Sequence, residues 1–168
     1  MKIGVFDSGI GGLSVANSIG RAIPEIEVVF RYDTADHFPY ANKSPDQIYE
    51  FVIPIFKQLI EEGCEVIVVA CNTVTTTLID RLRKQFSVPL VGIEPMVKPA
   101  AERTKSGVVT VCATPATLAS ERYHKLKRAY ANNITVIEPD CSDWSERQAT
   151  TFPNTLLGRF RYRPRVLA

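Results

Sequence analysis

The chain has 168 residues, of which 45% are apolar and 23% charged, with a net charge of +2, as expected of a soluble globular protein. This small charge gives no argument for a nucleic-acid or membrane partner, and no apolar run is long enough to span a bilayer. The four cysteines form no CxxC pair, which favours neither a zinc site nor a disulfide framework and indicates reduced thiols in the cytoplasm.

The first predicted elements are a strand over 2–6 and a helix over 13–22, joined by the glycine-rich loop 7–12. Glycines at such a turn let backbone N–H groups approach a bound anion. Their spacing matches neither a dinucleotide-binding fingerprint nor a P-loop. Asp7 and Ser8 follow the strand and are site candidates. The alternative for Asp7 is a carboxylate that caps the helix.

A second strand, over 27–32, leads into the long loop 33–41, which holds two aspartates, a histidine and an aromatic pair. Loops at the ligand edge of a sheet commonly carry contacts, and this one ends in Tyr40 and Ala41. His37 could serve as a catalytic acid or a zinc ligand, although a lone histidine is more often a surface or loop residue.

The stretch around which the chain is organised is a buried strand that ends at Cys71. Asn72 and Thr73 lead from it into a helix predicted over 74–86, so the thiol would lie at the carboxyl end of a strand and the amino end of a helix. The helix dipole there favours an anion and can lower the pKa of a thiol. The alternative is that Cys71 is one more small buried hydrophobic residue.

Strands and helices alternate along the rest of the chain, which predicts an α/β fold with a doubly wound parallel sheet. Thr114 and Thr117 can each supply a hydroxyl at the start of one of these helices, and simple capping by Thr114 is the alternative. The other predicted elements are a helix over 44–63, a strand over 88–93, a helix ending near 103, a strand over 107–112, a helix through 123–126 and a strand over 134–137.

Residues 145–168 differ in composition from the rest of the chain. Arginine recurs five times in this segment, whereas Glu146 is its only acidic residue. A basic arm for nucleic acid is one interpretation. We favour a poorly ordered terminus.

Four motifs together resemble the glutamate racemases of the aspartate/glutamate racemase family. They are the loop 7–13, Pro39-Tyr40-Ala41 before Lys43-Ser44, Ala70-Cys71-Asn72-Thr73, and Thr114-Pro115-Ala116-Thr117 with Ser120 and Tyr123. The resemblance covers about residues 1–144 and departs at Ala41, where the family usually has glycine. It implies an isomerase that interconverts L- and D-glutamate without a cofactor or metal and supplies D-glutamate for peptidoglycan.

The resemblance also implies two lobes with the substrate between them, here a first lobe over 1–94 and an incomplete second lobe over 95–144. Cys71 would be one of two cysteines that move protons on opposite faces of the substrate's α-carbon, with Asp7 assisting it. The implied substrate-binding residues are Ser8, Tyr40, Ala41, Asn72, Thr73, Thr114 and Thr117. Glutamate is then the expected partner, with no nucleic acid or membrane, and an oligomer is left open.

The family's second cysteine lies in a Gly-Cys-Thr-His motif, which does not occur in this chain, and Cys141 does not belong to such a motif. We therefore expect a C-terminally truncated chain whose racemisation is impaired or lost. One alternative is a non-catalytic module that binds a small carboxylate. Another is a related aspartate or hydantoin racemase, because Cys-Asn-Thr alone does not settle the substrate's side chain. The glycine-rich and Pro-Tyr loops favour glutamate.

Overall fold

A five-stranded sheet forms the centre of the computed structural model, which describes residues 1–33, 37–144 and 160–162. The strand order is β4-β3-β1-β2-β7, and the pairs among β1 to β4 are parallel, whereas β7 is antiparallel to β2. The strands are β1 (Lys2–Asp7), β2 (Glu27–Tyr32), β3 (Val66–Val69), β4 (Leu90–Gly92) and β7 (Phe160–Tyr162).

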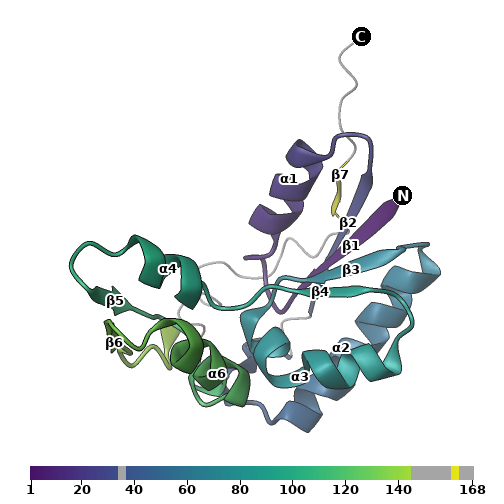
Figure 1. Cartoon of the computed structure of the whole chain (residues 1–168). Helices are drawn as coiled ribbons and strands as arrows, with labels where there is room; N and C mark the ends of the chain where they lie inside the picture. Colours follow the sequence, from purple (N-terminus) through teal and green to yellow (C-terminus); the bar gives the residue numbers. More distant parts are fainter. Residues whose placement is uncertain (34–36, 145–159, 163–168) are drawn as a thin grey trace.

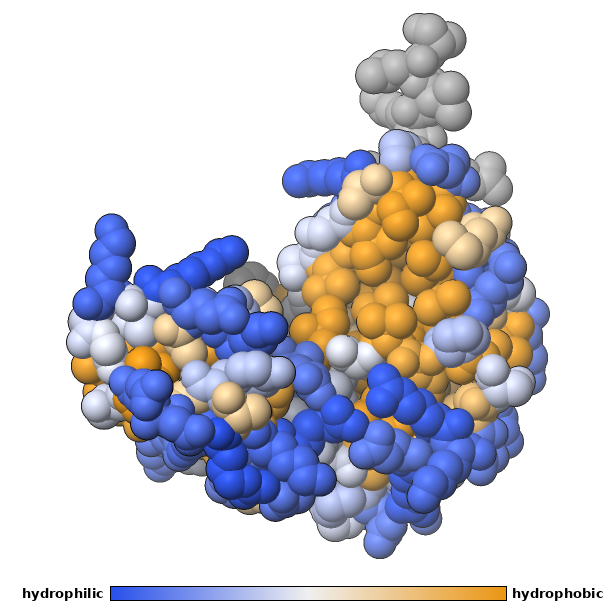
Figure 2. Space-filling view, viewed as in Figure 1, coloured by the Kyte–Doolittle hydropathy of each residue, from blue (hydrophilic) through white to orange (hydrophobic). Residues whose placement is uncertain are grey.

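Helices cover both faces of this sheet (Figure 1). On one face, α2 (Pro45–Glu61) and α3 (Asn72–Gln85) pack against the larger core, whereas α1 (Leu13–Ala22) covers part of the other face. Successive side chains of β3 point to opposite faces of the sheet, so Ile67 packs in the core on the α2 and α3 side and Val68 in the core on the α1 side. The face on the α1 side is only partly covered: Figure 2 shows apolar side chains gathered there beside α1, and Val91 is 51% exposed.

Helix α2 shows how local sequence sets these boundaries. Ser44 accepts a hydrogen bond from the Gln47 N–H, and the Gln47 side chain bonds back to the Ser44 N–H, which completes a capping box. The buried positions of the helix recur at helical spacing and include Val52 and Leu59, both with no exposed surface. Burying each such side chain contributes about 1.5–3 kcal/mol, which holds the helix against the sheet.

A separate two-stranded parallel sheet, β5 (Val108–Thr110) with β6 (Thr135–Ile137), lies beyond β4. It packs with α4 (Val97–Arg103), α5 (Pro115–Leu118) and α6 (Glu121–Tyr130) around a small core. We call residues 1–33 and 37–92 the first lobe and residues 97–144 the second lobe. The short 3₁₀ turn η1 (Tyr40–Asn42) belongs to the first lobe.

The predicted α/β class with a parallel sheet is confirmed, but two details differ from the prediction. The helix predicted after Thr114 is two helices, because Ser120 caps a second helix by accepting a hydrogen bond from the Tyr123 N–H. Within the basic tail, Phe160–Tyr162 forms the strand β7, which satisfies backbone groups at the open edge of β2. Residues 145–159 and 163–168, for which we also expected poor order, lie outside the described residues.

Across the described part of the chain, no helix combines the length and apolar character needed to cross a membrane.

Candidate functional site

Asp7, Ser8 and Cys71 meet at the carboxyl edge of the central sheet. Strands β1 and β3 are parallel neighbours with Phe6 beside Val69, so the residues that follow them emerge at the same place. The Ser8 Oγ lies 3.3 Å from the Cys71 Sγ, and Asp7 lies close enough to Cys71 for its charge to raise the pKa of the thiol. Cys71 is buried at the N-cap position of α3, and the predicted strand–thiol–helix arrangement is therefore present.

The glycine-rich loop holds the carboxylate of Asp7. The Gly12 N–H donates to Oδ2 at 2.7 Å, and the Ser8 N–H donates to Oδ1 at 2.9 Å. A Cβ on Gly12 would lie 2.6 Å from the Cβ of Asp7, so only glycine permits this close approach. Gly12 is the N-cap of α1 and no side chain among the described residues caps this helix, so Asp7 binds the N–H of the N-cap residue and is not itself the helix cap. The N–H groups expected to hold a bound anion hold Asp7 itself.

The pKa values of the thiol and the carboxyl correct one expectation. Burial, reinforced by the charge of Asp7, raises the pKa of Cys71 to about 11, whereas we expected the helix start to lower it. Hydrogen bonds from Ser8 and from the Val74 N–H favour the thiolate but are outweighed by the loss of hydration. Burial likewise raises the pKa of Asp7, against the N–H groups of Gly12 and Ser8. The thiol is therefore protonated in the resting site at neutral pH.

We expect this raised thiol pKa to make the protein less stable in alkali. The pKa of Cys71 is about 11 in the folded chain against an ordinary value of 9.0, so the unfolded chain loses its proton first. The stability linked to this proton is complete below about pH 9 and is lost as the pH rises to about 11. Urea unfolding at pH 8 and pH 10.5 should show a loss of about 2 kcal/mol from this group.

Cys71→Ser should lose less stability over this interval than the unmodified chain, whereas Cys112→Ser, at an exposed thiol, should lose as much as the unmodified chain. Some loss should persist in both variants, because burial also raises the pKa of Cys64 to about 11. Equal losses in Cys71→Ser and the unmodified chain would contradict the assignment.

Three threonine hydroxyls form a triangle that joins the two lobes. The Oγ1 of Thr73, at the start of α3, lies 3.0 Å from that of Thr114 and 3.3 Å from that of Thr117, which are themselves 3.0 Å apart. Thr114 also caps α5 by accepting from the Thr117 N–H, so the capping alternative holds as well. Each hydroxyl can act as a donor or an acceptor, so these hydroxyls can rotate to donate to a carboxylate.

Tyr40 is buried in η1 and is oriented by Asp33. Its hydroxyl donates to Oδ2 of Asp33, and the other oxygen of Asp33 lies 2.9 Å from Nδ1 of His37. Burial and this hydrogen bond raise the pKa of Tyr40, and the nearby charges of Asp7 and Cys71 add to the shift. The phenol therefore stays protonated close to the thiol. Asp33 had not been singled out, although it follows β2 at the same edge as Asp7.

Of the described residues, the remaining candidates Asn72, Ala41 and His37 form no hydrogen bond with the thiol of Cys71 or with the threonine hydroxyls. Asn72 is the first residue of α3 and its side chain is exposed, and Ala41 is partly buried in η1 beside Tyr40. The ring of His37 stacks on Phe51 with centroids 3.8 Å apart. Over the described ranges, His, Cys, Asp and Glu nowhere gather in threes that could hold a metal ion, so the zinc-ligand interpretation of His37 gains no support.

Comparison with known proteins identifies the relatives of this chain. Residues 3–156 match the Asp/Glu/Hydantoin racemase family. A glutamate racemase of Herpetosiphon aurantiacus is 42% identical over 139 residues, which are 83% of this chain and 54% of that protein. One from a Roseiflexus species is 43% identical over 140 residues, 83% of this chain and 51% of the relative. The chain thus spans about half the length of the curated relatives it matches.

Solved structures give the same result. The structure of Escherichia coli glutamate racemase in complex with L-glutamate and the activator UDP-MurNAc-Ala superposes with a TM-score of 0.80 at 35% identity, covering 89% of this chain and 56% of that one. The glutamate racemase of Aquifex pyrophilus superposes with a TM-score of 0.73 at 34% identity, covering 92% and 62%.

Proposed function

Since the chain belongs to the Asp/Glu/Hydantoin racemase family, we propose that Cys71 and Asp7 form one proton-transfer half of a glutamate racemase site. The observation that carries the proposal is the meeting of Asp7 and Cys71 at the carboxyl edge of the sheet, where the charge of Asp7 acts on the thiol. The named glutamate racemases among the relatives support the choice of substrate. Because the chain spans about half their length, the complete reaction and its role in supplying D-glutamate for peptidoglycan are part of the proposal.

The chemistry follows from the two raised pKa values. Asp7 accepts the proton of the Cys71 thiol, and the thiolate so formed takes the α-proton of the amino acid. The products are a thiol, a protonated Asp7 and a substrate carbanion. The return of a proton from sulfur regenerates the same enantiomer, and Asp7 then returns its proton to the thiolate. The thiol proton of Cys71 exchanges with solvent, so deuterium from D₂O would enter at the α-carbon.

Uncharged hydrogen-bond donors from both lobes bind the substrate. The hydroxyls of Thr73, Thr114 and Thr117 are placed to hold one carboxylate of glutamate, with Ser8, Tyr40, Ala41 and Asn72 completing the site. We propose that residues 1–94 and 95–144 are the two domains between which the substrate binds. The separate sheets and cores support this division, and exposed Val108 and Ile137 agree with a second domain that is only partly covered.

We further propose that this chain alone does not invert its substrate. Inversion by two bases needs an acid on the opposite face of the α-carbon, and the three other cysteines are placed differently. Cys64 lies in the core beneath the central sheet. Cys112 and Cys141 lie close to each other in the second lobe. No Gly-Cys-Thr-His sequence is present in the 168 residues.

A second candidate function is a binding module without catalysis. The pKa of about 11 favours it, because little Cys71 is thiolate at neutral pH unless a ligand promotes proton transfer to Asp7. Such a module would bind glutamate or another small carboxylate and would not exchange its α-proton.

Both candidate functions, the racemase half-site and the non-catalytic module, require that the chain bind glutamate, and this binding can be measured. Titration of ¹⁵N-labelled chain with L-glutamate, D-glutamate and aspartate should shift the amide signals of Thr73 and Thr117, with glutamate binding more tightly than aspartate. Thr117→Val removes one hydroxyl and should weaken glutamate binding about 10-fold or more, as for loss of a hydrogen bond to a charged group. Thr135→Val makes the same change at an exposed position of β6 and should have no effect. Equal affinity in all three proteins would contradict the assignment of the hydroxyl triangle.

A further inference from the structure

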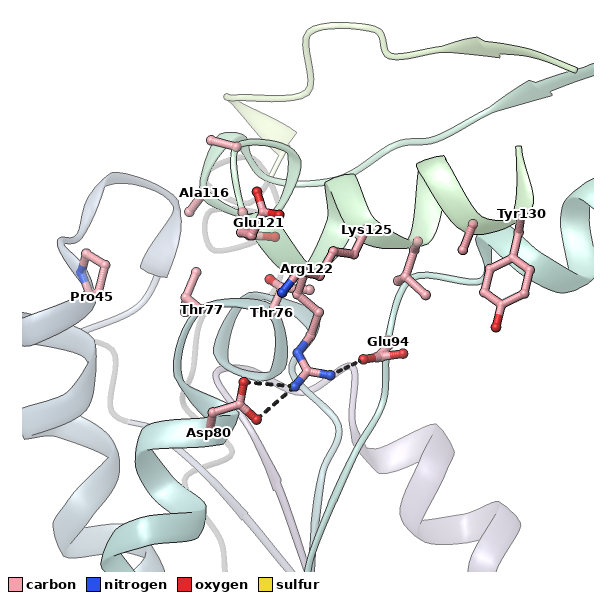
Figure 3. A pocket seen from close by; sticks show the side chains of 14 residues that line it. Pro45, Thr76, Thr77, Asp80, Glu94, Ala116, Glu121, Arg122, Lys125 and Tyr130 are labelled. Atoms are coloured by element: carbon pink, nitrogen blue, oxygen red, sulfur yellow. Dashed lines mark hydrogen bonds and ion pairs between the residues drawn. The ribbon is translucent and has the colours of Figure 1, made fainter. Parts of the chain in front are cut away.

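Arg122 joins three elements from both lobes. It lies on α6 in the second lobe, and its Nη2 contacts both carboxylate oxygens of Asp80 on α3 at 2.9 and 3.1 Å. Its Nη1 donates to Glu94, in the linker between β4 and α4, at 2.6 Å. Figure 3 shows the guanidinium between these two carboxylates. A single planar side chain therefore connects the second lobe both to the first lobe and to the linker.

Part of the space beside Arg122, between the two lobes, is open. A cavity of about 850 Å³ opens between α3 and α6, with Thr76 and Thr77 on one wall and Lys125 and Tyr130 on the other (Figure 3). Side-chain packing therefore does not fill the space between the helices, and the Arg122 side chain, which is 28% exposed, crosses it. The charged contacts of Arg122 link the two lobes across this space.

Helix α3 and the segment formed by α5 and α6 carry the hydroxyl triangle. Thr73 lies two turns before Asp80 on α3. Thr117 lies five residues before Arg122, and Ser120 ties the intervening turn by donating to the Thr117 carbonyl at 2.7 Å and capping α6. A change in the angle between α3 and α6 would therefore separate Thr73 from Thr117.

We propose that Arg122 is a positioning residue, a latch that fixes the second lobe on the first and so sets the spacing of the substrate-binding hydroxyls. The effect on binding rests on the proposed function, whereas the effect on lobe geometry does not. Arginine suits the task because its fork reaches two carboxylates at once, which the single ammonium group of lysine does less well.

Two measurements on the full chain test the latch. Residual dipolar couplings of backbone amides report the relative orientation of the lobes, and an L-glutamate titration reports affinity. We expect Arg122→Gln to need different alignment tensors for the two lobes and to bind about fivefold more weakly, the size expected of two partly screened ion pairs. Arg122→Lys should restore part of both properties.

The matched control is Arg128→Gln. Arg128 lies on the same helix and pairs with Glu121 of that helix at 2.6 Å, so its loss removes the same charge without touching the first lobe. It should behave as the unmodified chain. If Arg122→Gln does not fold, Asp80→Asn with Glu94→Gln removes the ion pairs of Arg122, together with the exposed pair of Asp80 with Arg83 within α3, and keeps the arginine stem. Different alignment tensors for the two lobes are expected again.

The outcomes separate the two proposals. Separate lobe tensors in Arg122→Gln, but not in Arg128→Gln, support the latch even if the unmodified chain binds no glutamate, a result that would count against the proposed function alone. A single tensor shared by Arg122→Gln and the unmodified chain overturns the latch. Equal loss of orientation in Arg128→Gln also overturns it, because the effect would then be one of charge.

Discussion

Replacing Cys71 with serine should reduce exchange of the glutamate α-proton with solvent by at least about 1,000-fold. A serine hydroxyl in the same buried position is far less acidic than a thiol, so Asp7 cannot generate a base from it. Proton NMR in D₂O measures the effect as the decay of the α-proton signal. The Cys71 variant should show no decay above a protein-free sample.

Cys112→Ser controls for the general loss of a thiol. Cys112 is exposed in the second lobe, so its replacement should leave the exchange rate unchanged. Exchange that persists in Cys71→Ser, or disappears in Cys112→Ser, would assign the proton transfer to another group.

Asp7→Asn should have the second largest effect, and it should change the pKa and the exchange rate in ways that loss of structure would not. Removing the negative charge beside Cys71 should lower the thiol's pKa from about 11, because that charge disfavours the thiolate. The α-proton exchange rate should nevertheless fall about 100-fold, since asparagine cannot accept the thiol proton.

Thiolate absorbance against pH measures the first effect of Asp7→Asn, and deuterium incorporation measures the second. Glu65→Gln, at an exposed carboxylate at the other end of the sheet, should change neither quantity. A lower thiol pKa accompanied by faster exchange would mean that Asp7 only suppresses the thiolate and takes no proton.

Much of the site's position could be predicted from local sequence. The β-branched run that ends at Cys71 and the strand that ends at Asp7 predict parallel strands, and parallel strands bring their carboxyl ends to one edge. The pairing of Phe6 with Val69 shows this edge directly. The roles of Thr114 and Thr117 came from the family resemblance, because two hydroxyls at a helix start are ordinary capping residues when taken alone.

Other features depended on distances that sequence does not contain. The direction of the Cys71 pKa shift depends on the balance between burial, the charge of Asp7 and N–H donors at the helix start. Burial has the largest effect and raises the pKa. Asp33 and Arg122 act through partners 4 to 42 residues away, at positions with no motif. Strand β7 arises because β2 has an open edge, a property of the assembled sheet rather than of the basic tail.

In the proposed function, this chain holds one thiol half of a two-thiol site. Incubation with L-glutamate and D-glutamate separately in D₂O, followed by NMR for deuterium and chiral chromatography for configuration, tests it most directly. We predict that deuterium enters the α-carbon of one enantiomer with retention of configuration. Inversion of either enantiomer at a rate comparable to deuterium incorporation would rule out a half-site, because the opposite face of the α-carbon would then have an acid of its own.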